Sequence, residues 1–449
     1  MKANMYVNRI LSLIFTVTIT VVVLCALTKI VERKEADSRF SDFYTSDPDI
    51  LFLGSSHMIN GVFPPQLWSD YGIVSYNCGV HGDYLPSTYW VMMNMLDHSN
   101  PKLVVVDCYL VGSNRKLGSY AFMHTWMDKV PLSKNKIKAI LDLTNDPNRK
   151  NSIQTSDFDN VTNPLDSGIP AEYIWDFIKY HSRWNELESV DFNGIHFPYY
   201  GAEVRMDITP LKYNPPQNVV PSDINDVAKD YLCKIINECK SRNIDVLLTY
   251  MPFSTDEIDI AHALSVQQLA KENGINFISY LDNDFINYET DFFDLGHLNY
   301  SGQQKVTKHL GKYIYTNYNI PDHRNDKNYK YMTENYVEMV DSQMDALSGS
   351  SSFEIMLEIL SSDIFNSVIK INNCDIINDK TVISFLNNMG LNTNELPTVP
   401  CVLIINEGKC SIESINSIPK EYTEEFFGDY SLKAIVTSKY TDRVVTVEL

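Results

Sequence analysis

Strand-like and helix-like segments alternate along residues 48–318, and this alternation restricts the chain to few folds. Short apolar runs have the length and bulk of buried parallel strands at 50–53, 102–107, 244–250 and 275–278. Apolar residues recur at helical spacing in other segments, at 87–96, 225–242, 256–273 and 301–313. Alternating elements of this kind predict an α/β protein with a mostly parallel sheet covered by helices.

An uncharged apolar segment at residues 10–28 is flanked on both sides by basic residues. At about 1.5 Å per residue, a helix of this length nearly matches the roughly 30 Å hydrocarbon core of a bilayer. A signal peptide has a shorter apolar stretch and a small-residue cleavage site, and neither is clear here. We therefore expect residues 1–35 to be an uncleaved membrane anchor, with a cleaved export signal as the alternative. Because basic residues lie on both sides, the positive-inside rule does not select an orientation.

Three further regions follow the anchor. The alternating pattern predicts a main domain at 40–320, which contains a polar, aromatic insertion at 113–220 beside the site. Residues 321–352 are charged and end in a serine-rich run, which is typical of a linker. Residues 353–449 carry strand-like runs and one helical segment, and they predict a small α/β domain of unknown role.

The charge and the cysteines exclude some classes of function. With 449 residues and a net charge of −20, the chain lacks the clustered Lys and Arg that nucleic-acid binding requires. The eight cysteines form no Cys-x-x-Cys pair and no Cys/His spacing typical of a metal site. We expect no metal, no cofactor and no nucleic-acid partner.

Two short strings far apart in the sequence carry the best functional signal. Gly54-Ser55-Ser56 follows the first predicted strand, where a small-residue turn can present a serine hydroxyl and free backbone N–H groups. Asp294 and His297 lie three residues apart, so that a carboxylate and an imidazole can face the same point. A turn serine alone more often bonds its own backbone. Serine, histidine and aspartate together are the parts of an acyl-transfer site.

These strings resemble the SGNH, or GDSL-type, hydrolase superfamily over residues 48–318. The resemblance implies a flavodoxin-like three-layer α/β/α fold, with Ser56 as nucleophile, His297 as general base and Asp294 as the partner that orients the imidazole. It implies an oxyanion hole formed by the backbone N–H groups of Ser56 and Gly82. Together with the anchor, the Gly-Ser-Ser turn resembles a membrane-bound branch that includes the D-alanyl transfer protein of teichoic acid synthesis and alginate O-acetylation proteins. That branch implies action outside the cytoplasmic membrane on cell-surface polymers, with a membrane-bound acyltransferase as partner.

The sequence departs from the family pattern at two positions. Ser55 stands where the family usually has aspartate, a change that the membrane-bound branch tolerates. The family's third oxyanion donor is an asparagine soon after the strand at 102–107, but the nearest asparagine here, Asn114, lies too far along the chain. Loss of one such donor costs on the order of 100- to 1000-fold in rate.

Other residues near the predicted site have both a functional and a structural interpretation. His57, His81, Asp107 and Tyr109 are candidates for substrate contact, although surface or packing roles are more common, and Asp107 is suited to capping a turn. The aromatic run at 180–184 suits sugar binding, but aromatic residues at helical spacing more often belong to a core.

Three functions remain open from the sequence. The first is a membrane-anchored serine esterase or O-acyltransferase, with its catalytic domain outside the cytoplasm and an acylated polysaccharide or teichoic-type polymer as substrate. The second is a non-catalytic member of the same fold that binds glycan or assembles an envelope complex. The third is a cytoplasm-facing lipid or thioester hydrolase, which the basic residues after the anchor keep open.

Overall fold

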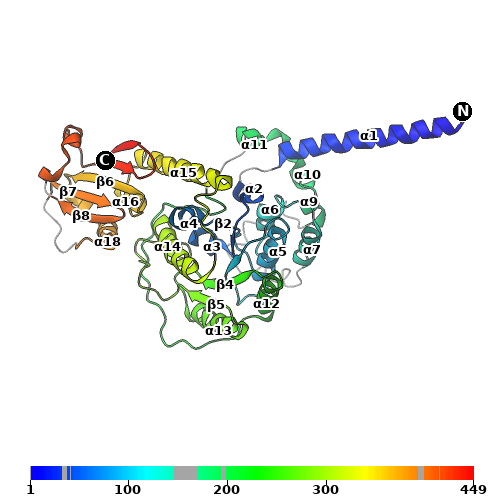
Figure 1. Cartoon of the computed structure of the whole chain (residues 1–449), viewed down its shortest axis with the longest axis horizontal. Helices are drawn as coiled ribbons and strands as arrows, with labels where there is room; N and C mark the ends of the chain where they lie inside the picture. Colours follow the sequence, from blue (N-terminus) through cyan, green and yellow to red (C-terminus); the bar gives the residue numbers. More distant parts are fainter. Residues whose placement is uncertain are drawn as a thin grey trace.

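A five-stranded parallel sheet forms the centre of the main domain (Figure 1). The computed structural model describes residues 2–32, 38–40, 42–145, 169–193, 199–392, 399–413 and 415–449. The strand order is β2-β1-β3-β4-β5, and every neighbouring pair is parallel. The strands are β1 (Ile50–Leu53), β2 (Ser75–Asn77), β3 (Leu103–Asp107), β4 (Asp245–Tyr250) and β5 (Asn276–Ser279). This is the order of flavodoxin-like sheets, and it confirms the predicted fold class.

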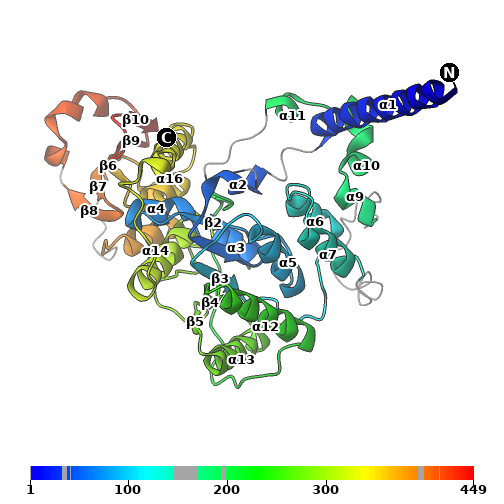
Figure 2. The same cartoon turned by 45° about the vertical axis from the view of Figure 1, so that its right-hand side comes forward.

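Helices cover both faces of this sheet. One group, α4 (Pro64–Tyr71) and α14 (Tyr300–Asn317), lies on the opposite side of the strands from α5 (Leu85–Met95) and α12 (Asp226–Ser241) (Figure 2). The short α3 (Ser56–Gly61) packs on α14, and α13 (Glu257–Asn273) packs on β4 and β5. The first β-strand therefore leads directly into a helix that is held by the last helix of the domain.

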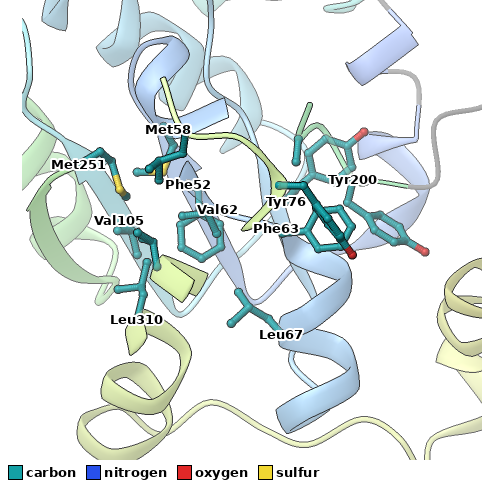
Figure 3. Close-up of a cluster of buried hydrophobic side chains, with 14 of the residues drawn as sticks. Phe52, Met58, Val62, Phe63, Leu67, Tyr76, Val105, Tyr200, Met251 and Leu310 are labelled. Carbon is teal, nitrogen blue, oxygen red and sulfur yellow. The ribbon is translucent and has the colours of Figure 1, made fainter. Parts of the chain in front are cut away.

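The core beneath the sheet's carboxyl ends joins these layers (Figure 3). Phe52 from β1, Met58 and Val62 around α3, and Leu310 from α14 are completely buried. Burying one such side chain contributes about 1.5–3 kcal/mol, and truncating it to alanine commonly costs about 2–5 kcal/mol. Packing at these positions therefore holds α3 against the sheet.

An apolar helix, α1 (Lys2–Val31), extends away from the rest of the chain (Figure 1). Its span Tyr6–Val31 is long and apolar enough to cross a membrane, and none of its most apolar stretch is buried. A signal sequence has the same properties, so these features alone do not separate an anchor from a leader.

The insertion predicted at 113–220 contains only helices in the part that the structure describes. They are α6 (Tyr120–Met127), α7 (Lys134–Leu143), α9 (Pro170–Ile174), α10 (Phe177–Tyr180), η3 (His181–Asn185) and α11 (Ser189–Asn193). The last three, α10, η3 and α11, lie beside the C-terminal end of α1 (Figure 2).

The C-terminal region forms a second, antiparallel sheet in the order β10-β9-β6-β7-β8. Its strands are β6 (Phe365–Ile371), β7 (Cys401–Asn406), β8 (Lys409–Glu413), β9 (Leu432–Ser438) and β10 (Val444–Glu448). Its helices are α16 (Phe353–Leu360), α17 (Cys374–Ile377) and α18 (Lys380–Asn388). This matches the small α/β domain expected at 353–449.

The range 321–352, predicted as a linker, is mostly one packed helix. It contains α15 (Lys330–Ser348), which lies between α4 and β10. Met339, Val340 and Met344 are completely buried on one face of this helix. The charged residues occupy the other face of the helix. The linker prediction was wrong because it considered the charged composition of this range and not the helical spacing of its apolar residues.

Candidate active site

The turn between β1 and α3 presents Ser56 at the carboxyl edge of the sheet. Gly54 has φ +145°, and a Cβ there would lie 2.8 Å from the Cβ of Asp107, so only glycine fits. Ser55 is the N-cap of α3, and its hydroxyl accepts a hydrogen bond from the backbone N–H of His57 at 3.3 Å. Because Ser56 is the first helical residue, its own N–H has no acceptor within the helix. The predicted nucleophile, Ser56, thus combines a hydroxyl with a backbone donor.

His297 and Asp294 meet Ser56 across the sheet edge. The Nε2 of His297 lies 2.7 Å from Ser56 Oγ, and its Nδ1 lies 2.9 Å from both carboxylate oxygens of Asp294. The same carboxylate accepts the backbone N–H groups of Gly296 at 2.8 Å and His297 at 2.9 Å. Asp294 therefore holds both the loop and the ring. The structure brings the three predicted side chains together in the order that serine-based acyl transfer uses.

The loop before α14 is held at both ends. Phe293 donates its backbone N–H to the carbonyl of His297 at 3.1 Å, and its ring stacks on the imidazole at 5.3 Å between centroids. Asn299 caps α14 by accepting the N–H of Gly302 at 3.2 Å. These contacts fix where the imidazole points.

Two side chains from beyond the main domain also support this loop. Glu358 of α16 is completely buried and accepts the backbone N–H of Tyr300 at 2.9 Å. Gln343 of α15 donates a hydrogen bond to the Tyr300 hydroxyl. Burial raises the pKa of Glu358 well above its usual range, against the backbone N–H groups that lower it. Sequence reasoning missed both residues because they lie outside the range that resembled the family.

The turn that carries Gly82 lies against the Ser56 turn. Val80 donates its N–H to the carbonyl of Gly54 at 2.9 Å, and Gly82 has φ +58°. Asn77, at the start of this turn, points inward: its amide donates to the carbonyls of Met58 and Val62 at 2.8 and 3.0 Å. Asn77 therefore supports α3, and its amide nitrogen is already engaged there.

Asn114 belongs to a different part of the surface. It lines a hollow together with Ser113, Asn225 and His262, and the lining of that hollow does not include Ser56. Asn114 is therefore not assigned as the third oxyanion donor.

His57 is a buried neighbour of the His297 imidazole. Its ring stacks on Tyr109 at 3.9 Å, is tilted against Phe253 at 4.8 Å, and meets His297 edge-on at 5.3 Å. Burial first, and then the charge of His297, lower the pKa of His57 well below its usual value. A neutral, packed His57 ring at this place limits the rotation of the His297 ring. Tyr109 packs against the other side of His57.

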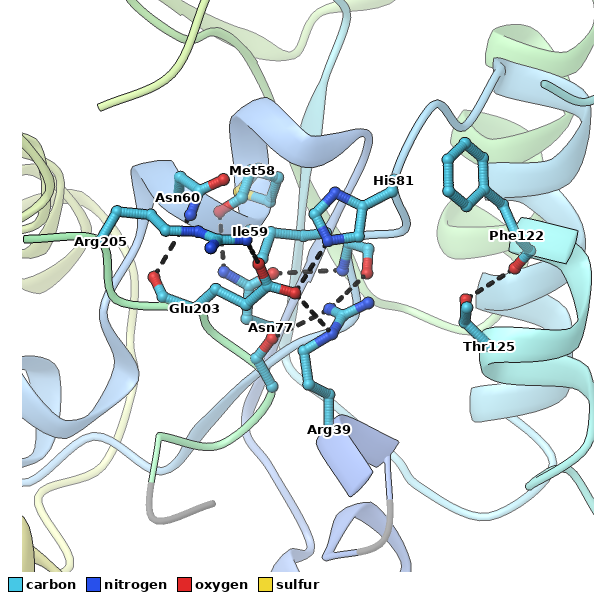
Figure 4. Close-up of polar contacts among 12 residues, drawn as sticks. Arg39, Met58, Ile59, Asn60, Asn77, His81, Phe122, Thr125, Glu203 and Arg205 are labelled. Atoms are coloured by element: carbon cyan, nitrogen blue, oxygen red, sulfur yellow. Dashed lines mark hydrogen bonds and ion pairs between the residues drawn. The ribbon is translucent and has the colours of Figure 1, made fainter. Parts of the chain in front are cut away.

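His81 belongs to a polar cluster behind the Gly82 turn (Figure 4). Its Nε2 lies 2.8 Å from Glu203, which also pairs with Arg39 at 3.3 Å and Arg205 at 3.1 Å. Burial alone would raise the pKa of Glu203, but the hydrogen bond and charge of His81 and the two arginines lower it to about 2. The Arg39 guanidinium also donates to the carbonyl of Gly79 at 3.1 Å. The cluster holds the turn in place, and it could not be predicted because its members lie far apart in the sequence.

Asp107 performs the structural role that its position allowed. It lies at the end of β3 and accepts the N–H of Met251 at 3.1 Å, which ties the ends of β3 and β4. Burial raises its pKa to about 7, against backbone hydrogen bonds that lower it. Asp83 is also buried and accepts the Thr88 hydroxyl at 3.1 Å, and burial raises its pKa to about 8.

Within the described ranges, no group of three His, Cys, Asp or Glu side chains lies close enough together to hold a metal ion. The fold and the site together define an α/β protein with a Ser–His–Asp arrangement at the carboxyl edge of a parallel sheet.

Comparisons with known proteins identify no family for this chain. No protein-family model matches the chain, and a search of curated proteins finds no match. Among solved structures, the chain is similar to a proposed acylhydrolase from Bacteroides fragilis, with 12% sequence identity and a TM-score of 0.30. The similarity covers 64% of this chain and 99% of that one. At this TM-score the similarity supports neither a family nor an activity for this chain.

Proposed function

We propose that this protein is an SGNH-type serine esterase or O-acyltransferase. The observation that carries the proposal is the continuous chain of contacts from Ser56 Oγ to His297 Nε2 at 2.7 Å and from His297 Nδ1 to Asp294 at 2.9 Å. A serine hydroxyl is a poor nucleophile unless a base lies within hydrogen-bond reach, and this geometry supplies one.

In the proposed reaction, His297 removes the Ser56 proton as Oγ attacks an ester carbonyl. The backbone N–H groups of Ser56 and Gly82 stabilise the oxyanion, and Asp294 stabilises the imidazolium. The tetrahedral intermediate collapses, the ester C–O bond breaks, and the leaving alcohol takes the proton from His297. Water or a sugar hydroxyl then attacks the acyl-Ser56 carbonyl with His297 again as base, which releases the acid or the new ester and regenerates the serine.

The proposed setting is the cell envelope. In this proposal α1 is a single membrane anchor, the main domain lies outside the cytoplasm, and the acyl group belongs to a cell-surface polysaccharide or teichoic-type polymer. A membrane-bound acyltransferase is the proposed partner that supplies acyl groups. The support for this setting is the apolar length of α1 and the resemblance of the motifs.

The test uses the full chain and two readouts. We expect turnover of an aryl acetate and covalent labelling by a fluorophosphonate, with both lost in Ser56→Ala. The control is Ser342→Ala, because Ser342 is an exposed serine on α15 whose hydroxyl bonds only the helix carbonyl of Glu338 among its described contacts. Labelling that persists in Ser56→Ala would contradict the assignment of the nucleophile.

A second candidate is a non-catalytic glycan-binding or assembly component with the same fold. The observation that favours it is the inward direction of the Asn77 amide, together with the place of Asn114 on another surface hollow. Polymer binding that is unchanged in Ser56→Ala, without any acyl-enzyme from aryl or polymer esters, would support this candidate over the first.

A further inference from the structure

Residues 169–193 pack against the inner end of the apolar helix α1 (Figure 2). The indole N–H of Trp175 donates to the Thr28 hydroxyl at 2.9 Å. The Arg183 guanidinium donates to the carbonyl of Val31 at 2.7 Å. These contacts, with the packing of α10, η3 and α11 on α1, place this segment beside the last turns of α1.

The same segment is also fixed to the main domain. The Tyr180 hydroxyl donates to Asp128 at 2.8 Å, and Asp128 pairs with the buried His124 at 2.7 Å. Arg183 pairs with the buried Asp191 at 3.0 Å. The aromatic run at 180–184, considered above as a sugar platform, therefore uses its tyrosine and arginine for internal contacts.

The same segment also exposes large apolar side chains. Trp184 is 72% exposed and Phe192 is 67% exposed, and they are accompanied by the exposed side chains of Ile174 and Ile178. The chain has five tryptophans, and the three that lie outside this segment are buried: Trp68, Trp90 and Trp126. Exposed apolar side chains that gather on one segment indicate an interaction surface.

The level of α1 at which residues 169–193 pack indicates that lipid headgroups surround their exposed side chains. The 26-residue span Tyr6–Val31 is about 39 Å long, which exceeds the roughly 30 Å hydrocarbon core of a bilayer. The end of the span would therefore reach the headgroup region. Thr28, which contacts Trp175, lies about 4.5 Å before Val31. Tryptophan is enriched at this depth, and interfacial helices insert their apolar face about 5–10 Å.

We propose that residues 169–193 lie in the membrane interface and insert Trp184 and Phe192 among the lipids. The inference rests on the proposed anchoring by α1 and adds a second contact that sets the orientation of the main domain. Since the chain has a net charge of −20, attraction to anionic lipid does not explain such binding, and insertion of apolar side chains must carry it.

The experiment measures quenching of tryptophan fluorescence in the full chain. The protein is reconstituted in phosphatidylcholine vesicles with and without lipids brominated near the headgroup end of their acyl chains. The emission of Trp184 is the difference between the wild type and Trp184→Phe. We expect the brominated lipid to reduce this emission, and to reduce it more than a lipid brominated near the chain ends.

Two reporters in the Trp184→Phe background separate the possible results. Phe427→Trp replaces an exposed aromatic residue of the C-terminal region and should not be quenched. Phe15→Trp reports on the middle of α1 and should be quenched by the deeper bromines. Quenching at residue 15 without quenching of Trp184 would overturn the interfacial surface alone and favour a protein partner there. Absence of quenching at both residue 15 and Trp184 would overturn the anchor and the surface together. Absence of fluorophosphonate labelling at Ser56 would contradict only the proposed chemistry.

Discussion

Asp294→Asn is the change that tests the proposed mechanism most directly. The Oδ1 of Asp294 accepts the backbone N–H groups of Gly296 and His297 at 2.8 and 2.9 Å. An asparagine oxygen can keep these two bonds, which leaves its NH₂ group at the place of Oδ2. There it faces His297 Nδ1 at 2.9 Å and must donate a hydrogen bond to it.

This donation changes the tautomer of His297. With Nδ1 as acceptor, the proton resides on Nε2, which lies 2.7 Å from Ser56 Oγ and then donates a hydrogen bond instead of removing a proton. The same exchange in a Ser–His–Asp triad lowers kcat by about 10⁴-fold. Since the Asp294 side chain is 46% exposed and water can compete for the ring, we expect a loss of about 10³- to 10⁴-fold in kcat/KM, or about 4 to 5.4 kcal/mol.

The assay is steady-state hydrolysis of an aryl acetate, with denaturant unfolding as a check on the fold. The stability of Asp294→Asn should stay within about 1 kcal/mol of the wild type, because the loop keeps its backbone hydrogen bonds. The matched control is Asp282→Asn, because Asp282 is an exposed loop residue. The activity of this variant should equal that of the wild type. An Asp294→Asn variant that retained more than about a tenth of the wild-type rate would refute the tautomer argument.

Three further changes test the support of the site. Glu358→Ala removes one of the two acceptors of the buried Tyr300 N–H, which also donates to the Arg205 carbonyl at 2.8 Å, and we expect a loss of about 0.5–1.5 kcal/mol in the free energy of unfolding by urea, whereas Glu358→Gln keeps an oxygen there and should lose less. Equal losses in the two variants would argue against the hydrogen bond. Burial raises the pKa of Asp83 from 3.8 to about 8, so the folded protein keeps a proton that the unfolded chain releases between these values. The free energy of unfolding should therefore fall as the pH rises through this window, and Asp83→Asn should flatten the fall in urea titrations at several pH values. Gly82→Ala adds a Cβ at φ +58°, 3.0 Å from Phe122, and should cost about 1–2 kcal/mol of stability and also lower the turnover of aryl acetate. Unchanged turnover in a folded Gly82→Ala variant would argue against its role as an oxyanion donor.

The parallel sheet was predictable because most of its strands are continuous apolar runs. β2 was missed because it has only three residues, Ser75–Asn77, and two of them are polar. The side chains of this strand are buried through hydrogen bonds: the Tyr76 hydroxyl donates to the carbonyl of Arg39 at 2.6 Å, and the Asn77 amide donates to Met58. Apolar patterns do not reveal a strand of this kind.

In the site too, residues close together in the sequence were predictable and partners from distant segments were not. Ser56 and the Asp294–His297 pair could be predicted because each lies in a short sequence motif. The partners of His81 and Tyr300 could not, since Glu203 and Glu358 reach them from distant segments that only the folded topology brings close. A carboxylate that serves as a buried acceptor leaves no spacing in the sequence.

The hydrogen bond from the Tyr300 N–H to Glu358 also has a consequence for the order in which the chain can fold during synthesis. During synthesis, the strands of the parallel sheet and the Asp294–His297 loop leave the ribosome before α16 does. Until α16 arrives, the Tyr300 N–H in the first turn of α14 has one of its two acceptors, the Arg205 carbonyl at 2.8 Å, and lacks the other, the Glu358 carboxylate at 2.9 Å. A chain that stops near residue 320 would therefore contain Ser56, Asp294 and His297 and still lack one of the hydrogen bonds that hold the start of α14, three residues beyond His297, so the C-terminal region completes the support of this loop late in synthesis.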